Sequence, residues 1–178
     1  MVRAMPFTPF HFGPALGIGI PLRNYLHTPT FIVANVILDV EPFLVLLLGL
    51  DYPLHGYLHT LVVAFLVGLL LGYVSFKFER FVQPLYRMFL LEPSGGLNIK
   101  SFLVAGAFGT MLHVLFDSPL YTDILPFFPL SANPMYNPSS SMSSGIVTLC
   151  ILMEIFGIAY YAALIIFSAY KKLTKQRG

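Results

Sequence analysis

The sequence predicts an all-α, polytopic membrane protein with about four spanning helices and a short N-terminal helix that is broken or re-entrant. Of its 178 residues, 57% are hydrophobic and only 10% are charged, and the mean hydropathy is +0.79. A soluble domain contains about 25% charged residues and needs them to cover its water-exposed surface. This composition therefore excludes a soluble globule, a disordered chain and a coiled coil. The length favours a single integral membrane domain over residues 1–178.

The expected spans are long runs with few acidic or basic residues, because a helix needs about 20 apolar residues to cross the hydrocarbon core. The first element, residues 9–22, is too short and too rich in glycine and proline for a full span. Four spans are expected near residues 30–50, 52–76, 99–117 and 146–170. An amphipathic extension over residues 77–91 should follow the second of them.

The longest connection, residues 118–144, contains five prolines and then a serine-rich run. A connection of this length in a small domain is more often a binding loop or a lid than a passive linker. We therefore expect residues 118–144 to form a loop or lid over a site. The single cysteine, Cys150, lies in an apolar run and should be a small buried side chain, which leaves no disulfide and no cysteine-based zinc site.

Basic residues predict the orientation of the helices, because cytoplasmic loops are enriched in lysine and arginine. Three of them, Lys77, Arg80 and Arg87, lie between the second and third spans, Lys100 lies at the start of the third, and residues 171–178 form a basic tail. We therefore expect a multi-pass protein of the cell membrane with a cytoplasmic C-terminus and an extracytoplasmic loop at 118–144. The tail is a topology signal rather than a nucleic-acid patch, so no nucleic-acid partner is expected. The sequence does not indicate an oligomeric state.

Ionisable side chains lie within or beside the apolar segments, where each costs roughly 2.5–3.5 kcal/mol on insertion scales and is a functional candidate. These residues are His11, Asp39, Glu41, His55, His59, His113, Asp117 and Glu154. His55 and His59 are four residues apart, as are His113 and Asp117, so on helices each pair would share one face. The predicted topology puts both pairs at the outer side of the membrane.

Two ligands on one helical turn, completed by ligands from a second helix, are a common metal site in helical bundles. Imidazole and carboxylate ligands suit Zn²⁺, with Mn²⁺ or Fe²⁺ as alternatives. A break at Pro42 would bring Asp39 toward the same cavity, and His11 could reach a similar depth. Simpler interpretations stay open, since His113 and Asp117 could form an intrahelical ion pair. Glu154 could make a helix–helix hydrogen bond, and His27 is expected to be solvated in a loop.

Four short motifs follow one another in the order TPFHFG at 8–13, LDVEP at 38–42, HGYLHT at 55–60 and HVLFDS at 113–118. In these motifs the chain resembles the membrane-bound metal-dependent hydrolases, a family that includes a LexA-regulated bacterial inner-membrane protein. The resemblance covers residues 6–130 and looks closest to archaeal members. The third motif is one residue shorter than the bacterial form and lacks its arginine, so His59 matches the family more firmly than His55.

The resemblance implies a metal-dependent hydrolase, and the family is suggested to act as a phospholipase. The expected metal ligands are His11, Asp39, His59, His113 and Asp117. His55 is a further ligand or an acid, and Glu41 or Asp123 would take the proton of the attacking water. A site at the outer interface favours a phospholipid or a lipid-linked ester or phosphoester as substrate. Two alternatives use the same cluster: a metal-ion or proton transporter, and a non-enzymatic protein whose metal clamps the helices.

Overall fold

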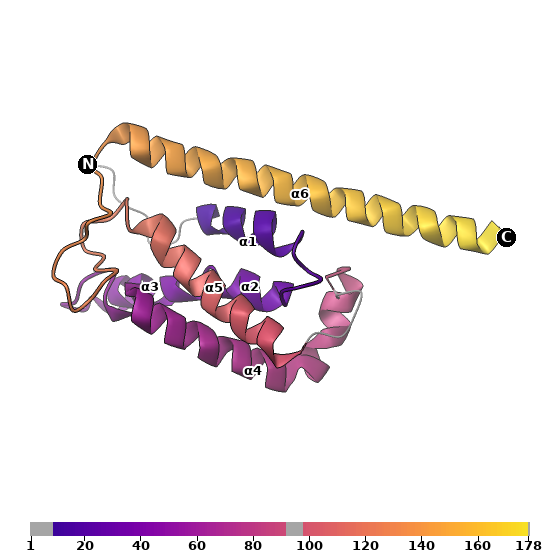
Figure 1. Ribbon diagram of the computed structural model, residues 1–178, viewed down its shortest axis with the longest axis horizontal. Helices are drawn as coiled ribbons and strands as arrows, with labels where there is room; N and C mark the ends of the chain where they lie inside the picture. Colours follow the sequence, from indigo (N-terminus) through magenta and orange to yellow (C-terminus); the bar gives the residue numbers. More distant parts are fainter. Residues whose placement is uncertain (1–8, 92–97, 178) are drawn as a thin grey trace.

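The computed structural model describes residues 9–91 and 98–177 (Figure 1). Within these ranges the chain is helical and contains no strand. The helices are α1 (Phe12–Gly19), α2 (Thr28–Ala34), α3 (Val40–Leu48), α4 (Leu61–Met88), α5 (Ile99–Asp117) and α6 (Ser140–Arg177). Short 3₁₀ turns precede three of them, η1 (Pro9–His11), η2 (Ile37–Asp39) and η3 (Tyr57–His59). The predicted all-α fold with a short N-terminal helix is confirmed.

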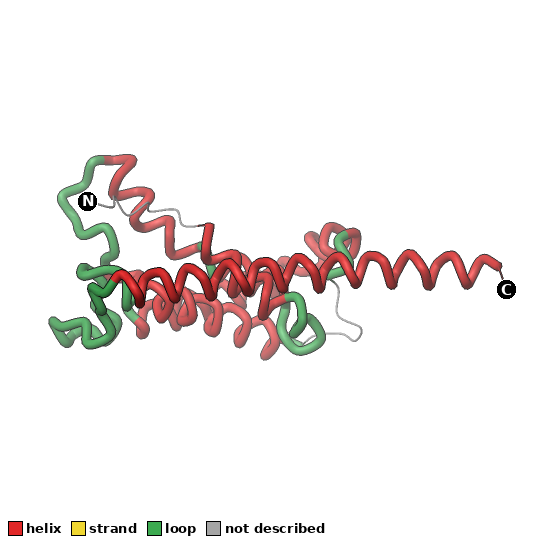
Figure 2. The backbone as a smooth tube through the Cα atoms, turned by 90° about the horizontal axis from the view of Figure 1, so that it is seen from above, coloured by secondary structure: helices red, strands yellow, loops and turns green. Residues whose placement is uncertain are grey.

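Four helical stretches are long and apolar enough to cross a membrane: Thr28–Leu48, Leu61–Met88, Ile99–Asp117 and Ser140–Lys175. They run alternately in opposite directions along the bundle, and the connecting loops gather at its two ends (Figures 1 and 2). One end carries the connections 49–60 and 118–139, and the other carries the connection 20–27 and the C-terminus. The composition of these stretches agrees with the predicted multi-pass membrane protein.

The first spanning stretch is two short helices rather than one long helix. The sequence offered Pro42 as a place where a break would bring Asp39 toward the cavity, but the chain leaves α2 at Asn35 and Val36 and resumes through η2 into α3. Pro42 lies in the first turn of α3, where its missing N–H removes no intrahelical hydrogen bond. The break frees the backbone carbonyl of Asn35, as happens at any helix C-terminus. Asp39 is the last residue of η2 and sits immediately beyond this break.

The second span begins later than the sequence predicts. Residues 52–56 are irregular, η3 follows, and α4 starts only at Leu61. The side-chain oxygen of Thr60 accepts a hydrogen bond from the backbone N–H of Val63 (3.3 Å), which is a typical helix N-cap. The prediction that His55 and His59 share one helical face is therefore wrong. The two imidazole rings nevertheless lie edge to face, with centroids 4.8 Å apart, because the loop folds back on itself.

Helix α6 extends past the other helices at its C-terminal end and packs mainly against α1 (Figure 1). It begins at Ser140, so the connection after α5 ends at Ser139, earlier than predicted. The hydroxyl oxygen of Ser139 accepts a hydrogen bond from the N–H of Met142 (3.2 Å), which starts the helix inside the serine-rich run. Cys150 is buried against α1, as predicted, while Glu154 is only half-buried on α6.

His27 is buried, and the prediction that it is solvated is wrong, since only 2% of the residue is exposed. Its imidazole stacks on the ring of Phe102, with centroids 3.9 Å apart, and meets the edge of Tyr86. Nδ1 of His27 lies 2.7 Å from the hydroxyl of Thr30. Burial lowers the pKa of His27 to about 4, so the ring is neutral and behaves as part of the core.

Candidate metal centre

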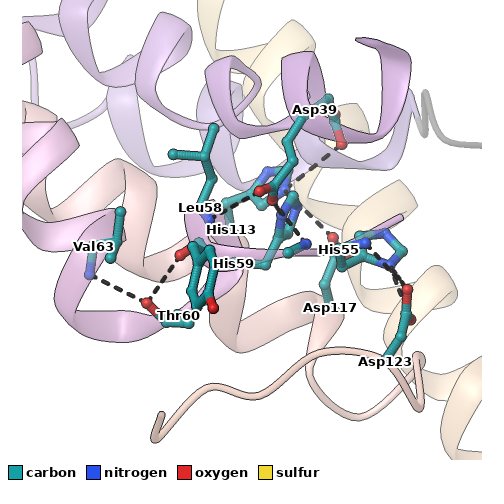
Figure 3. A network of polar contacts seen from close by, with 12 residues as sticks. Asp39, His55, Leu58, His59, Thr60, Val63, His113, Asp117 and Asp123 are labelled. Atoms are coloured by element: carbon teal, nitrogen blue, oxygen red, sulfur yellow. Dashed lines mark hydrogen bonds and ion pairs between the residues drawn. The ribbon is translucent and has the colours of Figure 1, made fainter. Parts of the chain in front are cut away.

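Six of the ionisable residues singled out above converge in the interior near one end of the bundle. Figure 3 shows the part of this cluster around His59, His113 and Asp117. They come from four places in the fold: η1, η2, the 55–59 segment before α4, and the last turns of α5. The converging residues are His11, Asp39, His55, His59, His113 and Asp117, and all six are buried. The structure thus brings all five predicted metal ligands together and adds His55. Glu154 belongs to neither of the ligand groups described below.

The first group of donors contains His11, Asp39, His113 and Asp117, whose ligand atoms lie within 4.8 Å of one another. Nε2 of His113 is 3.3 Å from Oδ2 of Asp117 and 3.7 Å from Oδ1 of Asp39. Nε2 of His11 is 3.2 Å from Oδ1 of Asp117, and the rings of His11 and His113 stack with centroids 3.8 Å apart. Four donors at this spacing match the ligand number of a closed tetrahedral site.

The second group contains His55, His59 and Asp117, again with ligand atoms within 4.8 Å of one another. Asp117 therefore belongs to both groups. Its carboxylate is the only donor that the two groups have in common among the described residues. Three protein donors are the usual number at a catalytic zinc site, where the fourth position is left for water or substrate.

Three of the histidines are held by hydrogen bonds at Nδ1, on the side away from the cluster. Nδ1 of His113 lies 2.7 Å from the backbone oxygen of Asn35, and Nδ1 of His59 lies 2.8 Å from Oε2 of Glu41. Nδ1 of His55 lies 3.0 Å from Oδ1 of Asp123. A carbonyl or carboxylate oxygen only accepts, so each Nδ1 carries the proton and donates it. Metal-binding histidines are held in this way, which fixes the ring and frees Nε2.

The two Nε2 atoms of His59 and His113 then face each other at 3.3 Å. With its proton on Nδ1, a neutral imidazole presents a lone pair at Nε2, the atom that would bind a metal ion. His59 and His113 belong to different donor groups, so this contact brings the three-donor and the four-donor group side by side.

Buried polar groups without hydrogen bonds also indicate that the residues of the cluster suit a cation. Nε2 of His11 is fully buried and makes no hydrogen bond, because its short contact with Asp117 lacks hydrogen-bond geometry. Burial lowers the pKa of His11, but the carboxylates of Asp117 and Asp39 outweigh it and raise the pKa overall. Buried carboxylates carry a high desolvation cost unless a cation compensates them. The residues present thus fit a divalent cation in both ligand type and charge.

Glu41 and Asp123, which the sequence predicts as proton acceptors, both hold the histidine segment in place through hydrogen bonds. Glu41 accepts hydrogen bonds from the backbone N–H groups of Gly56 (3.0 Å) and Leu58 (3.2 Å), besides the one from the imidazole Nδ1 of His59. Asp123 also accepts the backbone N–H of His55 at 3.1 Å. Burial raises the pKa of Asp123, but the hydrogen bonds from His55 outweigh this effect and hold the pKa below its usual value. The carboxylate therefore acts as a hydrogen-bond acceptor.

A cavity of about 200 Å³ reaches the cluster at His55. Its lining includes Gly56, which follows this histidine in the chain, and Asp123, whose carboxylate contacts its imidazole. The remaining lining is mostly aromatic and apolar: Tyr52, Pro53, Tyr57, Thr60, Leu125 and Phe128. His55 lines the cavity and is also one of the three donors, so the cavity gives access to the three-donor group.

The sequence left Glu41 open as a ligand, a proton acceptor or a hydrogen-bond partner of a ligand, and it gave no indication of the other outer hydrogen bonds. The acceptor for His113 is a backbone carbonyl, which carries no side-chain signal. The acidic side chains at positions 41 and 123 could have been recognised as partners of histidines only from the three-dimensional fold.

Comparisons with known proteins leave the family open, since no family model, curated protein or solved structure matches this chain. The resemblance to membrane-bound metal-dependent hydrolases therefore remains a prediction from the four motifs. The class that the fold and the cluster define is an all-helical, multi-pass membrane protein with a buried group of histidines and aspartates suited to a metal ion.

The hydrogen bond between Glu41 and His59 provides a prediction about metal affinity. Glu41→Gln keeps the size of the side chain but removes the carboxylate that receives the Nδ1 proton of His59. We expect metal affinity to fall by about 10–100-fold, the usual effect of losing such a partner. Titration with zinc in competition with a fluorescent chelator measures the change. Asp51→Asn, which removes an exposed carboxylate near the same end of the bundle, is the control and should bind like wild type.

Proposed function

We propose that this protein is a metal-dependent hydrolase that acts on a phospholipid or a lipid-linked ester or phosphoester. The observation that carries the proposal is the pairing of the three-donor group with the cavity at His55. A donor group with an open position beside a cavity is the arrangement of a catalytic metal site rather than a purely structural one. The four-motif resemblance supports the same class of reaction.

In this proposal the four-donor group holds an ion in a closed site, and the three-donor group forms the catalytic site. His55, His59 and Asp117 would hold a divalent cation there, which we take to be Zn²⁺, and a bound cation would supply Lewis-acid chemistry for a phosphoryl or acyl oxygen and for water near neutral pH. Asp123 keeps the imidazole of His55 in one orientation at the cavity wall. Glu41 fixes the backbone at Gly56 and Leu58, so the histidine segment does not have to reorganise when substrate enters.

Lipid access is supported by the side chains around the cavity. Tyr57 is 57% exposed and Phe128 is 44% exposed, and their rings meet edge to face with centroids 5.3 Å apart. Aromatic side chains of this kind prefer the membrane–water interface, where a lipid would enter laterally. The basic residues that predict the cytoplasmic side lie toward the opposite end of the bundle, which favours an extracytoplasmic position for the cavity.

Hydrolysis by purified protein in lipid nanodiscs tests the proposal directly. We expect product release from a phospholipid or a lipid-linked phosphoester, its loss after chelation and its recovery when Zn²⁺ is restored. His55→Ala should lower turnover by roughly 100-fold or more, because the open site loses a donor. The same variant should keep the ion of the four-donor group, measured by mass spectrometry of the metal content.

Asp51→Ala provides the matched control, since it truncates an exposed side chain in the same connection. Equal turnover of the His55→Ala and Asp51→Ala proteins, or hydrolysis that survives complete chelation, would refute the proposed site. Metal uptake into proteoliposomes without lipid hydrolysis would instead identify a transporter. Thermal stabilisation by metal without either activity would identify a metal that only clamps the helices.

A further inference from the structure

The charge of the cavity at His55 bears on which bond the candidate site can cleave. Apart from His55 itself, Asp123 is the only residue with a charged side chain among the described residues that line this cavity. Its carboxylate oxygens lie 3.0 and 3.1 Å from Nδ1 of His55 (Figure 3). Burial raises the pKa of Asp123, but the hydrogen bonds from His55 hold it below the usual value, so the side chain is ionised at neutral pH. A negative charge therefore lies at the wall of the cavity.

Three hydrogen-bond donors in the lining of the cavity are already engaged within the protein. The backbone N–H of Gly56 donates to Oε2 of Glu41, 3.0 Å away. The hydroxyl of Tyr52 donates to Oε1 of the same carboxylate at 3.4 Å. The hydroxyl of Thr60 donates to the backbone oxygen of Tyr57 at 2.9 Å. These donors are thus directed at protein oxygens, and Glu41 adds a second carboxylate next to the lining.

A phosphoester and a carboxylic ester make different demands on such a cavity. A lipid phosphodiester carries a negative charge, and its cleavage spreads charge over several phosphoryl oxygens, which enzymes stabilise with arginine, lysine or metal ions. A carboxylic ester is neutral, and negative charge develops on its one carbonyl oxygen during hydrolysis. A single cation at the three-donor group suffices for one oxygen. The described lining of the cavity offers an acid and no lysine or arginine for the remaining oxygens of a phosphate.

We infer that the bond cleaved at this site is the carboxylic ester of a lipid acyl chain, an inference that rests on the proposed function. In this reaction the oxygen of water forms a bond with the carbonyl carbon, and the bond between that carbon and the alkoxy oxygen breaks. One proton of the water ends on the alkoxy oxygen, so a free fatty acid and an alcohol are released. Leu125 and Phe128 provide an apolar surface for the hydrocarbon next to the carbonyl group.

Product analysis in nanodiscs of phosphatidylcholine and diacylglycerol tests the inference, because phosphatidylcholine contains both kinds of bond. We expect chelator-sensitive release of free fatty acid to be at least roughly tenfold faster than release of phosphocholine or choline. Chromatography with mass spectrometry measures all three products. Phosphocholine or choline as the main chelator-sensitive product would overturn the inference while supporting the proposed hydrolase. Absence of every chelator-sensitive product would refute the proposed function, and the inference with it.

A cation placed in the cavity tests the electrostatic reason for this preference. Phe128 and its neighbour Phe127 are 44% and 40% exposed, but of the two only Phe128 lines the cavity. In the Phe128→Lys protein, phosphatidic acid should inhibit fatty-acid release at about tenfold lower concentration than in wild type, because lysine can form a charge-assisted hydrogen bond with the phosphate.

Phe127→Lys is the matched control for this substitution and should be inhibited like wild type. Equal inhibition of the two variants by phosphatidic acid would overturn the inference, because the charge of the cavity would then not exclude phosphates. The metal content of each variant reports whether it is folded. If Phe128→Lys does not fold, Tyr57→Lys replaces it, since Tyr57 is also exposed and lines the same cavity.

Discussion

Replacing Asp117 by asparagine is expected to remove metal from both donor groups at once. The substitution keeps the shape of the side chain but removes its negative charge, and Asp117 is the donor that the two groups share. Its oxygens lie 3.2 Å from Nε2 of His11 and 3.3 Å from Nε2 of His113. We expect the affinity for Zn²⁺ to fall by more than about 100-fold, since even outer hydrogen-bond partners account for 10–100-fold.

Two further variants separate this effect from a general loss of charge. Asp39→Asn changes only the four-donor group and His55→Ala only the three-donor group, so each should lower the metal content less than Asp117→Asn does. Asp51→Asn removes an exposed carboxylate near the same end of the bundle and should leave the content unchanged. Elemental analysis after dialysis measures all four proteins. A wild-type metal content in the Asp117→Asn protein would contradict the shared-ligand arrangement.

The spans could be predicted from the sequence because lipid contact leaves few alternatives to apolar side chains. Helices α4 and α6 expose many large apolar residues, and composition alone identifies them. Their boundaries could not be predicted in the same way. The late start of α4 depends on the N-cap at Thr60, and the break after α2 depends on how Asn35 fits beneath α5. Pro42, the place that the sequence offered for a break, lies in the first turn of α3, where a proline removes no intrahelical hydrogen bond.

The candidate ligands could be predicted because ionisable groups are rare in apolar segments, so their positions carry information. The reason given for pairing His55 with His59 was wrong, since neither residue is in an α-helix. What brings them together is the set of hydrogen bonds that Glu41 and Asp123 make with the loop backbone. For His27 the predicted exposure was wrong. Its neighbours in sequence indicate a solvated loop, but Phe102 and Tyr86, which are distant in sequence, pack around its ring.

Introducing a side chain at Gly106 should separate the two helices on which the metal centre depends. A Cβ atom built at Gly106 of α5 would collide with the backbone oxygen of Gly68 on α4 and would lie 3.0 Å from the backbone nitrogen of Gly72. Membrane helices commonly pack through close contacts between small residues. At this contact the hydroxyl of Thr110 on α5 donates a hydrogen bond to the backbone oxygen of Ala64 on α4 (2.7 Å). Backbone atoms cannot move aside as a flexible side chain can.

We therefore expect Gly106→Leu to destabilise the fold by about 3 kcal/mol or more, which corresponds to a melting temperature roughly 6–12 °C lower. The metal content should fall as well, because α5 carries His113 and Asp117 while His59 lies just before α4. Thermal unfolding in detergent, followed by circular dichroism, measures the change. Gly145→Leu is the matched control, since a Cβ atom at Gly145 in α6 meets no atom within 4 Å. Melting of the two variants at the same temperature would show that α4 and α5 do not cross at these glycines.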